Sequence, residues 1–221
     1  MKTTRAARIF LVDDHPLVRE SLASLIERQP DLTVCGEASS APAARAGIAS
    51  THPDVAVVDL SLGEGSGLAL IRDLHLTHPG VAVLVLSMYD EDLYAERALR
   101  AGARGYIMKR EATGNVILAI RRVLEGKVYL TARMTATLAE KLVRGAPQAE
   151  ESVVSRLSDR ELEVFRLMGQ GQATRQIAES LNVSAKTVQA FSARIKEKLG
   201  LSSSTELLRE AIRWAEEQRE R

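Results

Sequence analysis

Five short apolar runs, separated by segments with helical periodicity, constrain the fold of this 221-residue chain more than any other feature. Most of the runs are rich in Val, Ile and Leu without strict polar alternation, which is typical of parallel strands buried on both faces. Their ranges are 8–12, 32–38, 54–59, 81–87 and 104–109. The alternation of five strands with five helices predicts a doubly wound α/β domain around a five-stranded parallel sheet.

The pattern changes after the fifth run and its helix. Met134, Leu138 and Leu142 are spaced at i, i+4 and i+8, which predicts a short helix from about Thr131. The stretch "RGAPQAEES" at 144–152 combines Gly, Pro and charge as linkers do. Beyond it the pattern is wholly helical. We therefore expect a first domain at 5–125, a partly helical linker at 126–152 and a small all-α domain at 153–221.

Start signals divide the last domain into four short helices. Ser158 precedes Glu161 by three residues, which predicts a capping box at the first helix. Ser184 is expected to cap the third helix, and Ser203 or Ser204 the fourth.

Composition excludes several classes of protein. The net charge is +1, so no global basic field indicates a nucleic-acid partner. Cys35 is the only cysteine, which excludes an intramolecular disulfide and a multi-thiolate metal site. The apolar run near the N-terminus is too short for a signal peptide, and no run approaches transmembrane length. We expect a cytoplasmic protein without a membrane partner.

Polar residues follow four of the five apolar runs, at the points where the predicted strands end. They are Asp13 and Asp14, Asp59, Ser87 and Lys109, after the first, third, fourth and fifth runs. Ligands of an open parallel sheet bind beyond the carboxyl ends of its strands, so we expect these side chains to converge. Three clustered carboxylates need a cation to stay ionised together, and hard oxygen ligands favour Mg²⁺.

This set of groups suits the transfer of a phosphoryl group to a carboxylate. Asp59 is the best nucleophile because it stands alone before an open, Gly-rich loop, while Asp13 and Asp14 would hold Mg²⁺. Lys109 and Ser87 would donate to the phosphoryl oxygens. Taken singly, each aspartate is equally well explained as a turn residue or a helix cap, the lysine as a solvated side chain and the serine as a cap.

The segments "VDDHPLVRESL", "DVAVVDLSLGEGSGL", "VLVLSMYDED" and "ALRAGARGYIMKREA" resemble the receiver domain of a bacterial two-component response regulator of the NarL/FixJ type. The resemblance covers about residues 5–125 and implies a flavodoxin-like fold. It implies that Asp59 is the phosphoacceptor. The implied Mg²⁺ ligands are Asp13, Asp14, Asp59 and the backbone carbonyl of Ser61.

The same resemblance assigns the remaining groups of the pocket. Ser87 is the switch hydroxyl, Lys109 faces the phosphoryl group, and Tyr106 is the aromatic residue whose rotamer reports the state of the domain. Two residues depart from the family pattern: Gly63 stands where many members have Pro, and Ser87 where Thr is commoner. Neither removes a required group. Without the resemblance, Tyr106 would be taken as a half-buried strand residue with its hydroxyl in water.

The stretch "TRQIAESLNVSAKTVQAFSARI" has the pattern of two helices joined by a tight turn. Apolar residues line one face of each helix, with Phe191 leaning inward on the second. A second helix held in this way can lie in a DNA major groove, with basic flanks on phosphate. The residues expected to face DNA are Lys186, Thr187, Gln189, Ala190, Ala193, Arg194 and Lys196. Periodicity alone fits a helical bundle for protein contacts equally well.

The elements "LSxRExEV", "IAxxLxVSxxTV" and "KLG" in this region resemble the LuxR-type helix-turn-helix, over about residues 153–216. Phe191 and Ser192 stand where the family usually has His and often a basic residue. The groove face is therefore less basic than in many members, although Gln189 can read adenine and Ala can contact a thymine methyl. Affinity would depend on Lys186, Arg194 and dimerisation.

The last helix carries an apolar stripe with few remaining partners. The stripe consists of Leu208, Ala211, Ile212 and Ala215. By resemblance this helix is the usual dimer contact, and packing within its own bundle is the alternative.

Together the two resemblances imply a phosphorylation-controlled transcription factor. A sensor histidine kinase would phosphorylate Asp59, the receiver would change conformation and dimerise, and the homodimer would bind double-stranded promoter DNA. We do not expect an enzyme, beyond slow self-phosphorylation from small donors and autodephosphorylation. An aspartyl-phosphate phosphatase generally needs a second Asp two residues after its nucleophile, where this chain has Ser61 or Pro16. The remaining alternative acts independently of phosphorylation, through a protein partner.

Overall fold

The structure is a computed structural model that describes residues 5–62, 66–89, 91–143, 153–181 and 183–219. The chain separates into two compact units, Met1–Gly145 and Ala146–Arg221, and each is described by itself. Gly63 and the predicted linker stretch 144–152 lie outside the described residues.

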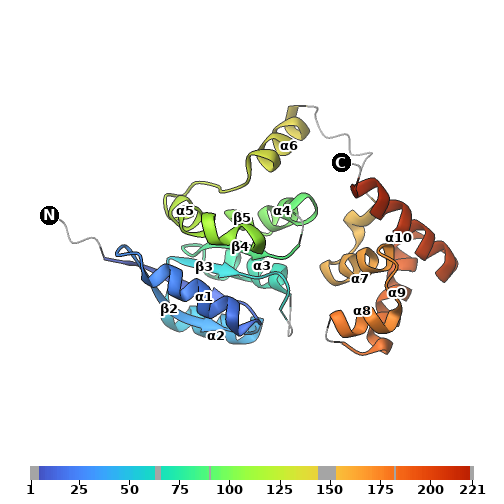
Figure 1. Cartoon of the computed structure of the whole chain (residues 1–221), viewed down its shortest axis with the longest axis horizontal. Helices are drawn as coiled ribbons and strands as arrows, with labels where there is room; N and C mark the ends of the chain where they lie inside the picture. Colours follow the sequence, from blue (N-terminus) through green and yellow to red (C-terminus); the bar gives the residue numbers. More distant parts are fainter. Residues whose placement is uncertain (1–4, 63–65, 90, 144–152, 182, 220–221) are drawn as a thin grey trace. The chain divides into compact units, whose positions relative to one another are not determined.

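A five-stranded parallel sheet forms the centre of the first unit (Figure 1). Its strands are β1 (Ala7–Val12), β2 (Leu32–Ala38), β3 (Val55–Val58), β4 (Ala82–Ser87) and β5 (Gly105–Met108). The order across the sheet is β2-β1-β3-β4-β5, and all pairs are parallel. The predicted doubly wound α/β fold, followed by an all-α unit, is confirmed.

Helices cover both faces of this sheet. They are α1 (Pro16–Glu27), α2 (Ala41–Thr51), α3 (Gly67–Thr77), α4 (Glu91–Arg100) and α5 (Ala112–Leu124), with a short 3-10 helix η1 (Lys109–Glu111) before α5. Ile9 and Leu11 pack with α1 and α5 in one buried cluster. Phe10 points to the other face because neighbouring strand residues alternate. Its ring fills the space left by two residues without side chains, Gly36 and Gly47, where an added Cβ would lie 2.5 Å from the ring.

The segment after α5 remains attached to the first unit. Tyr129 pairs with the outer edge of β5: its backbone nitrogen donates to Arg104 at 2.9 Å and its carbonyl accepts from Tyr106 at 3.0 Å. A helix then begins where the apolar spacing predicts one, α6 (Ala132–Val143). The Thr131 hydroxyl accepts from the Met134 amide at 3.2 Å and caps this helix.

The second unit consists of a 3-10 turn and four helices. They are η2 (Val153–Arg156), α7 (Asp159–Gly169), α8 (Thr174–Ser180), α9 (Ala185–Leu199) and α10 (Ser204–Arg219). The predicted capping box of Ser158 and Glu161 is present. Ser184 caps α9, accepting from Thr187 at 3.0 Å, and Ser203 rather than Ser204 accepts from Glu206 at 3.1 Å before α10.

Buried contacts hold the helices of this unit together. The Phe165 ring of α7 lies 5.7 Å from the Trp214 ring of α10, and both are buried. Glu161 of α7 accepts from Lys198 of α9 at 2.6 Å. Burial alone would raise the pKa of Glu161, but the bonds from Lys198 and Ser158 hold it below its usual value.

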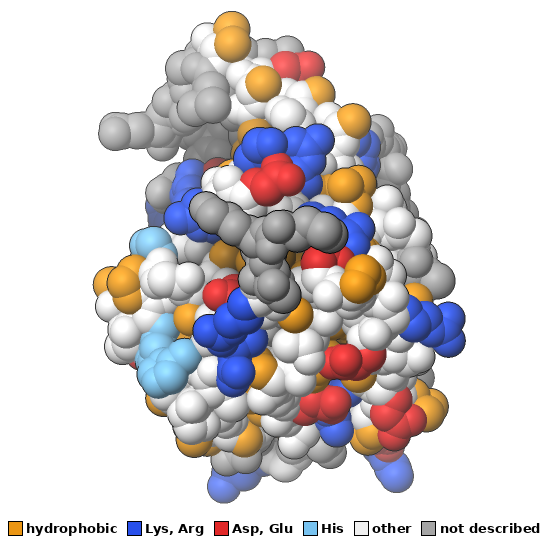
Figure 2. Space-filling model, turned by 90° about the vertical axis from the view of Figure 1, so that its left-hand side faces the viewer, with side chains coloured by type: hydrophobic (Ala, Val, Ile, Leu, Met, Phe, Trp, Pro, Cys, Tyr) orange, Lys and Arg blue, Asp and Glu red, His pale blue; other side chains and the backbone are white. Residues whose placement is uncertain are grey.

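One face of the molecule is mixed in charge. On the face shown in Figure 2, basic and acidic side chains are interspersed and neither sign forms one continuous field. This distribution agrees with the net charge of +1. No helix among the described residues is long and apolar enough to cross a membrane.

Candidate functional site

The carboxyl ends of four strands bring the predicted pocket residues together at one edge of the sheet. Asp13 follows β1, Asp59 follows β3, Ser87 ends β4 and Lys109 follows β5. Asp13, Asp59 and Ser87 are at most 2% exposed. The neighbouring parallel strands are in register, so their ends reach the same edge and these groups converge although as many as 96 positions separate Asp13 from Lys109 (109 − 13).

Lys109 joins two of the carboxylates. Its ammonium Nζ lies 2.6 Å from Asp59 Oδ2 and 2.6 Å from Asp13 Oδ2. Burial raises the pKa of the Asp59 carboxyl to about 6, although the attraction of Lys109 opposes the shift. Burial lowers the pKa of Lys109, but the attraction of Asp59 and the hydrogen bonds to both carboxylates outweigh it and raise the pKa. The cation stays protonated while the buried carboxylate resists full ionisation.

A divalent cation fits beside these groups. Asp13, Asp14, His15 and Asp59 each offer one ligand atom, and these atoms lie within 4.8 Å of one another. Asp14 Oδ1 is buried and lies 2.7 Å from the ring Nδ1 of His15. Carboxylates gathered this closely repel one another, and a bound cation would remove that cost. Carboxylate oxygens are the ligands that Mg²⁺ prefers.

His15 is a member of this cluster for which the sequence gives no role. It directly follows the two aspartates, and its ring Nδ1 lies 2.7 Å from Asp14 Oδ1 and 3.3 Å from Asp13 Oδ1. Its backbone nitrogen also donates to Asp13 Oδ1 at 2.9 Å, which fixes that carboxylate. In the sequence, only the position of His15 next to Asp14 pointed to this cluster, and that position does not set the direction of its side chain.

Tyr89 links the hydroxyl groups around the pocket, and sequence reasoning missed it. Its backbone nitrogen donates to Ser87 Oγ at 3.2 Å, and its carbonyl accepts from the Tyr106 hydroxyl at 2.9 Å. Its own hydroxyl forms a short hydrogen bond with the Ser61 hydroxyl, and its ring stacks on Tyr94 with centres 4.7 Å apart. The only signal in the sequence was its place two residues after Ser87.

Tyr106 is fully buried, with its hydroxyl on the Tyr89 carbonyl. The interpretation of this residue as half-buried with its hydroxyl in water is therefore wrong. The Ser61 backbone nitrogen donates to Asp59 Oδ1 at 3.1 Å, so Ser61 also lies at the pocket.

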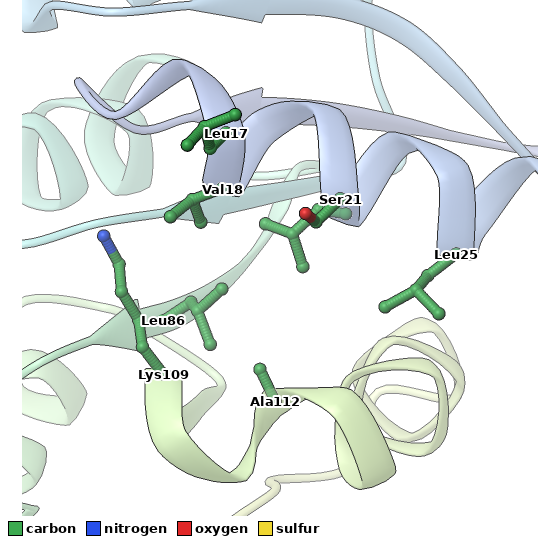
Figure 3. A pocket seen from close by; sticks show the side chains of 8 residues that line it. Leu17, Val18, Ser21, Leu25, Leu86, Lys109 and Ala112 are labelled. Carbon is green, nitrogen blue, oxygen red and sulfur yellow. The ribbon is translucent and has the colours of Figure 1, made fainter.

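An apolar groove lies beside the pocket, between α1 and the start of α5 (Figure 3). Leu17, Val18 and Leu25 enter it from α1, with Leu86 of β4 and Ala112 of α5 on the other side. Figure 3 shows Lys109 extending from the end of β5 past Leu86, toward the N-terminal end of α1. The groove thus begins where the charged pocket ends.

The predicted DNA-facing residues lie on one exposed side of α9. Lys186, Gln189, Ala190, Ala193 and Arg194 are exposed, and Thr187 and Lys196 are half-buried. On the opposite side Val188 and Ile195 are buried in the unit. Phe191, expected to lean inward as core, is only half-buried, and the guanidinium carbon of Arg194 lies 4.9 Å from the centre of its ring.

The apolar stripe of α10 divides between the interior and the surface. Ala211 is fully buried against α7, where an added Cβ on Gly169 would lie 2.3 Å from the Ala211 carbonyl. Leu208 and Ile212 remain 41% and 38% exposed. Ala211 therefore packs within the unit, Ala215 is half-buried, and Leu208 and Ile212 remain on its surface.

Comparisons with known proteins match both units. A family model described as "Response regulator receiver domain" matches residues 9–121, and one described as "Bacterial regulatory proteins, luxR family" matches residues 155–211. The oxygen regulatory protein NreC of Staphylococcus epidermidis is 35% identical over 211 residues, covering 93% of this chain and 97% of that protein.

Solved structures of response regulators also match this chain. A two-component response regulator of the LuxR family from Aurantimonas sp. has 35% sequence identity and a TM-score of 0.58, covering 62% of this chain and 99% of that chain. RcsB from Salmonella enterica serovar Typhimurium, bound to promoter rprA in the presence of the phosphomimetic BeF3-, has 25% identity and a TM-score of 0.59. That match covers 93% of this chain and 98% of RcsB.

Proposed function

Because this chain belongs to the family of response regulators that join a receiver domain to a LuxR-type helix-turn-helix, we propose that phosphorylation of Asp59 controls its binding to promoter DNA. The family is one of transcriptional regulators and not of enzymes. The observation that carries the proposal is the buried Asp59 carboxylate, held by Lys109 at 2.6 Å beside Asp13 at the open edge of the sheet.

Asp59 would act as the nucleophile. One of its carboxylate oxygens forms a bond to phosphorus, and the bond from phosphorus to the donor breaks, with its electron pair leaving on the donor. The raised pKa of about 6 still leaves most of this carboxyl ionised at neutral pH. The phosphorylated side chain carries more negative charge than the carboxylate it replaces, so Lys109 and the Ser87 hydroxyl gain a stronger acceptor for their protons.

Asp13, Asp14, Asp59 and the backbone carbonyl of Ser61 would hold Mg²⁺. When bound, this ion neutralises the charge that gathers on the phosphoryl oxygens. The clustering of ligand atoms from Asp13, Asp14 and Asp59 within 4.8 Å of one another supports this assignment. His15 would act on the carboxylates it touches, keeping Asp13 and Asp14 turned toward the pocket.

Ser87, Tyr89 and Tyr106 would carry the signal away from Asp59. The Ser87 hydroxyl now accepts from the Tyr89 backbone, and the Tyr106 hydroxyl is held by the Tyr89 carbonyl. When the Ser87 hydroxyl turns to donate to a phosphoryl oxygen, its hydrogen bond from the Tyr89 backbone changes. The hydrogen bond between the Tyr89 carbonyl and Tyr106 would change with it. The phosphoryl group would thereby shift an existing equilibrium between two arrangements.

Domain 153–221 would bind double-stranded DNA through α9, and domain 5–125 would be the receiver, with 126–152 as the linker between them. Two of the solved relatives are RcsB bound to promoter rprA and an RcsB–DNA complex. The exposed side of α9 offers Lys186 and Arg194 for the same purpose. We further propose a homodimer on DNA, with Leu208 and Ile212 of α10 as its contact, a sensor histidine kinase as the phosphodonor, and action in the cytoplasm, where promoter DNA lies.

The proposal is tested by measuring intact mass after incubation with Mg²⁺ and a small phosphodonor such as acetyl phosphate. The full-length protein should gain one phosphoryl group, and Asp59→Asn should gain none. Asp54→Asn is the matched control, because Asp54 is an exposed aspartate at the other end of the same strand. Chelation of Mg²⁺ should slow the gain strongly. Phosphorylation of Asp59→Asn at the rate of the unmodified protein would contradict the assignment.

A further inference from the structure

The Arg194 side chain lies along α9 in a direction that the sequence does not reveal. Its guanidinium carbon is 4.9 Å from the centre of the Phe191 ring, and its Nε donates to the Ala190 carbonyl at 3.4 Å. Both partners precede Arg194, by three and four residues. The side chain therefore runs back toward the N-terminus of the helix, as long helical side chains prefer to do.

This direction changes the part of DNA that Arg194 can reach. The N-terminal residues of a recognition helix contact base edges, whereas its flanks meet phosphate. From its place in the sequence Arg194 would be a flanking phosphate contact, but its guanidinium lies over Phe191, level with the exposed Ala190. No carboxylate pairs with Arg194 in the part of the chain that the structure describes, so its donors are available.

We propose that Arg194 reads a guanine in the major groove and that Phe191 is the residue that positions it. Guanine presents two acceptors, O6 and N7, and the planar guanidinium fork donates to both at once. This inference rests on the proposed DNA-binding function and goes beyond it by naming the base and the reader. The phosphate contacts are then left to Lys186 and Lys196.

Phe191 is suited to this role because it is half-buried. The buried part of the ring is fixed by the unit, and its outer part offers a flat surface to the guanidinium. A single cation–π contact at an exposed site is weak. Its effect here is to order a long side chain before DNA arrives, so that less freedom is lost on binding. The departure of residue 191 from the family's usual His is thus given a physical consequence.

Four variants of the full-length protein separate the recognition of a base from the effect of charge alone. Each is titrated with a DNA site selected by the unmodified protein and with every single-base substitution of that site, at several salt concentrations. Arg194→Lys should lose roughly 5- to 150-fold of the discrimination at one G·C pair, because a lysine keeps the charge but not the fork. The slope of log affinity against log salt should stay unchanged. Lys186→Ala, the phosphate control, should weaken binding to all sequences alike and lower that slope by about 1.

Phe191→Leu should weaken binding to the selected site severalfold with the salt slope unchanged, and Phe191→Tyr, which keeps the ring, should restore it. The fluorescence of Trp214 and the far-ultraviolet circular dichroism report whether the variants remain folded. Arg194 is exposed, so Arg194→Lys keeps the test valid even if Phe191→Leu unfolds. Unchanged discrimination in Arg194→Lys at every position would overturn the inference while leaving DNA binding intact. Failure of the unmodified protein to select any sequence would overturn both, and is seen without any variant.

Discussion

At the scale of single residues, Asp59 combines a buried position with a charge. Its pKa is raised to about 6 from an ordinary value of 3.8, and the first cause is burial. Between these two pH values the folded protein keeps a proton that the unfolded chain has released. The contribution of this proton to stability is therefore complete below about pH 4 and is lost as pH rises through about 6.

The substitution Asp59→Asn removes this loss of stability at higher pH. The difference in unfolding free energy between Asp59→Asn and the unmodified protein should grow in favour of the asparagine as pH rises from 4 to 7, by roughly 2–3 kcal/mol. All four tyrosines lie in the first unit, so tyrosine fluorescence during urea unfolding without metal reports the relevant transition. Added Mg²⁺ should stabilise the unmodified protein more than the variant, because it binds the folded carboxylates. If the difference in unfolding free energy stayed constant over this pH range, ionisation of Asp59 would not be what lowers the stability of the folded protein.

Gly67 is a residue at which any side chain would collide with the backbone of the pocket. An added Cβ would lie 2.3 Å from the Asp59 carbonyl and 2.6 Å from the Leu60 Cα, where α3 approaches the end of β3. Gly67→Ala should cost roughly 1–3 kcal/mol of stability and slow phosphorylation of Asp59, because the loop that holds the carboxylate must shift. Gly80→Ala is the control, since an added Cβ there meets nothing within 4 Å. Equal urea midpoints for the two variants would contradict this account.

At the scale of elements, the start of α6 is bound to the start of α4. The Thr131 hydroxyl donates to Glu91 Oε1 at 2.7 Å while it caps α6, and Arg133 lies 3.4 Å from the same oxygen. Glu91 is 3% exposed, and its Oε2 has no hydrogen-bond partner among the described residues. The attachment of α6 therefore depends on the Glu91 carboxylate, whose Oε1 accepts from Thr131 and Arg133.

Thr131→Val keeps the shape of the side chain and removes both bonds. It should cost roughly 1–3 kcal/mol and make the amides of α6 exchange with solvent markedly faster, because the cap is lost and Glu91 is left underpaired. Hydrogen exchange read by mass spectrometry measures this directly. Thr135→Val serves as the control, since that exposed hydroxyl only bonds to the Thr131 carbonyl within the helix. Equal hydrogen exchange of the α6 amides in the two variants would mean that Glu91 does not anchor this helix.

The positions of backbone elements could be predicted from the sequence, whereas many contacts of side chains could not. Buried runs locate the strands, and parallel strands must end at one edge, so the convergence of Asp13, Asp59 and Lys109 follows from periodicity alone. Local caps such as Ser184 follow from spacing. The bonds of Tyr89 and the direction of Arg194 depend on rotamers chosen by packing, and no sequence period encodes these.

At the scale of the whole molecule, each unit carries its own optical reporter. Trp214, the only tryptophan, lies in the second unit, and the four tyrosines lie in the first. We propose an energetic coupling between the two units, in which phosphorylation of Asp59 in one unit changes the affinity of α9 in the other unit for DNA. Such couplings typically change an affinity about 5- to 150-fold.

The most direct test measures the dissociation constant of the full-length protein for its selected DNA site, with Mg²⁺, before and after a small phosphodonor, in the unmodified protein and in Asp59→Asn. Mass spectrometry on the same samples gives the fraction phosphorylated. We expect the phosphorylated protein to bind at least about fivefold more tightly, and Asp59→Asn to bind equally with and without the donor. An unmodified protein that is fully phosphorylated on Asp59 and binds DNA with unchanged affinity would contradict this coupling.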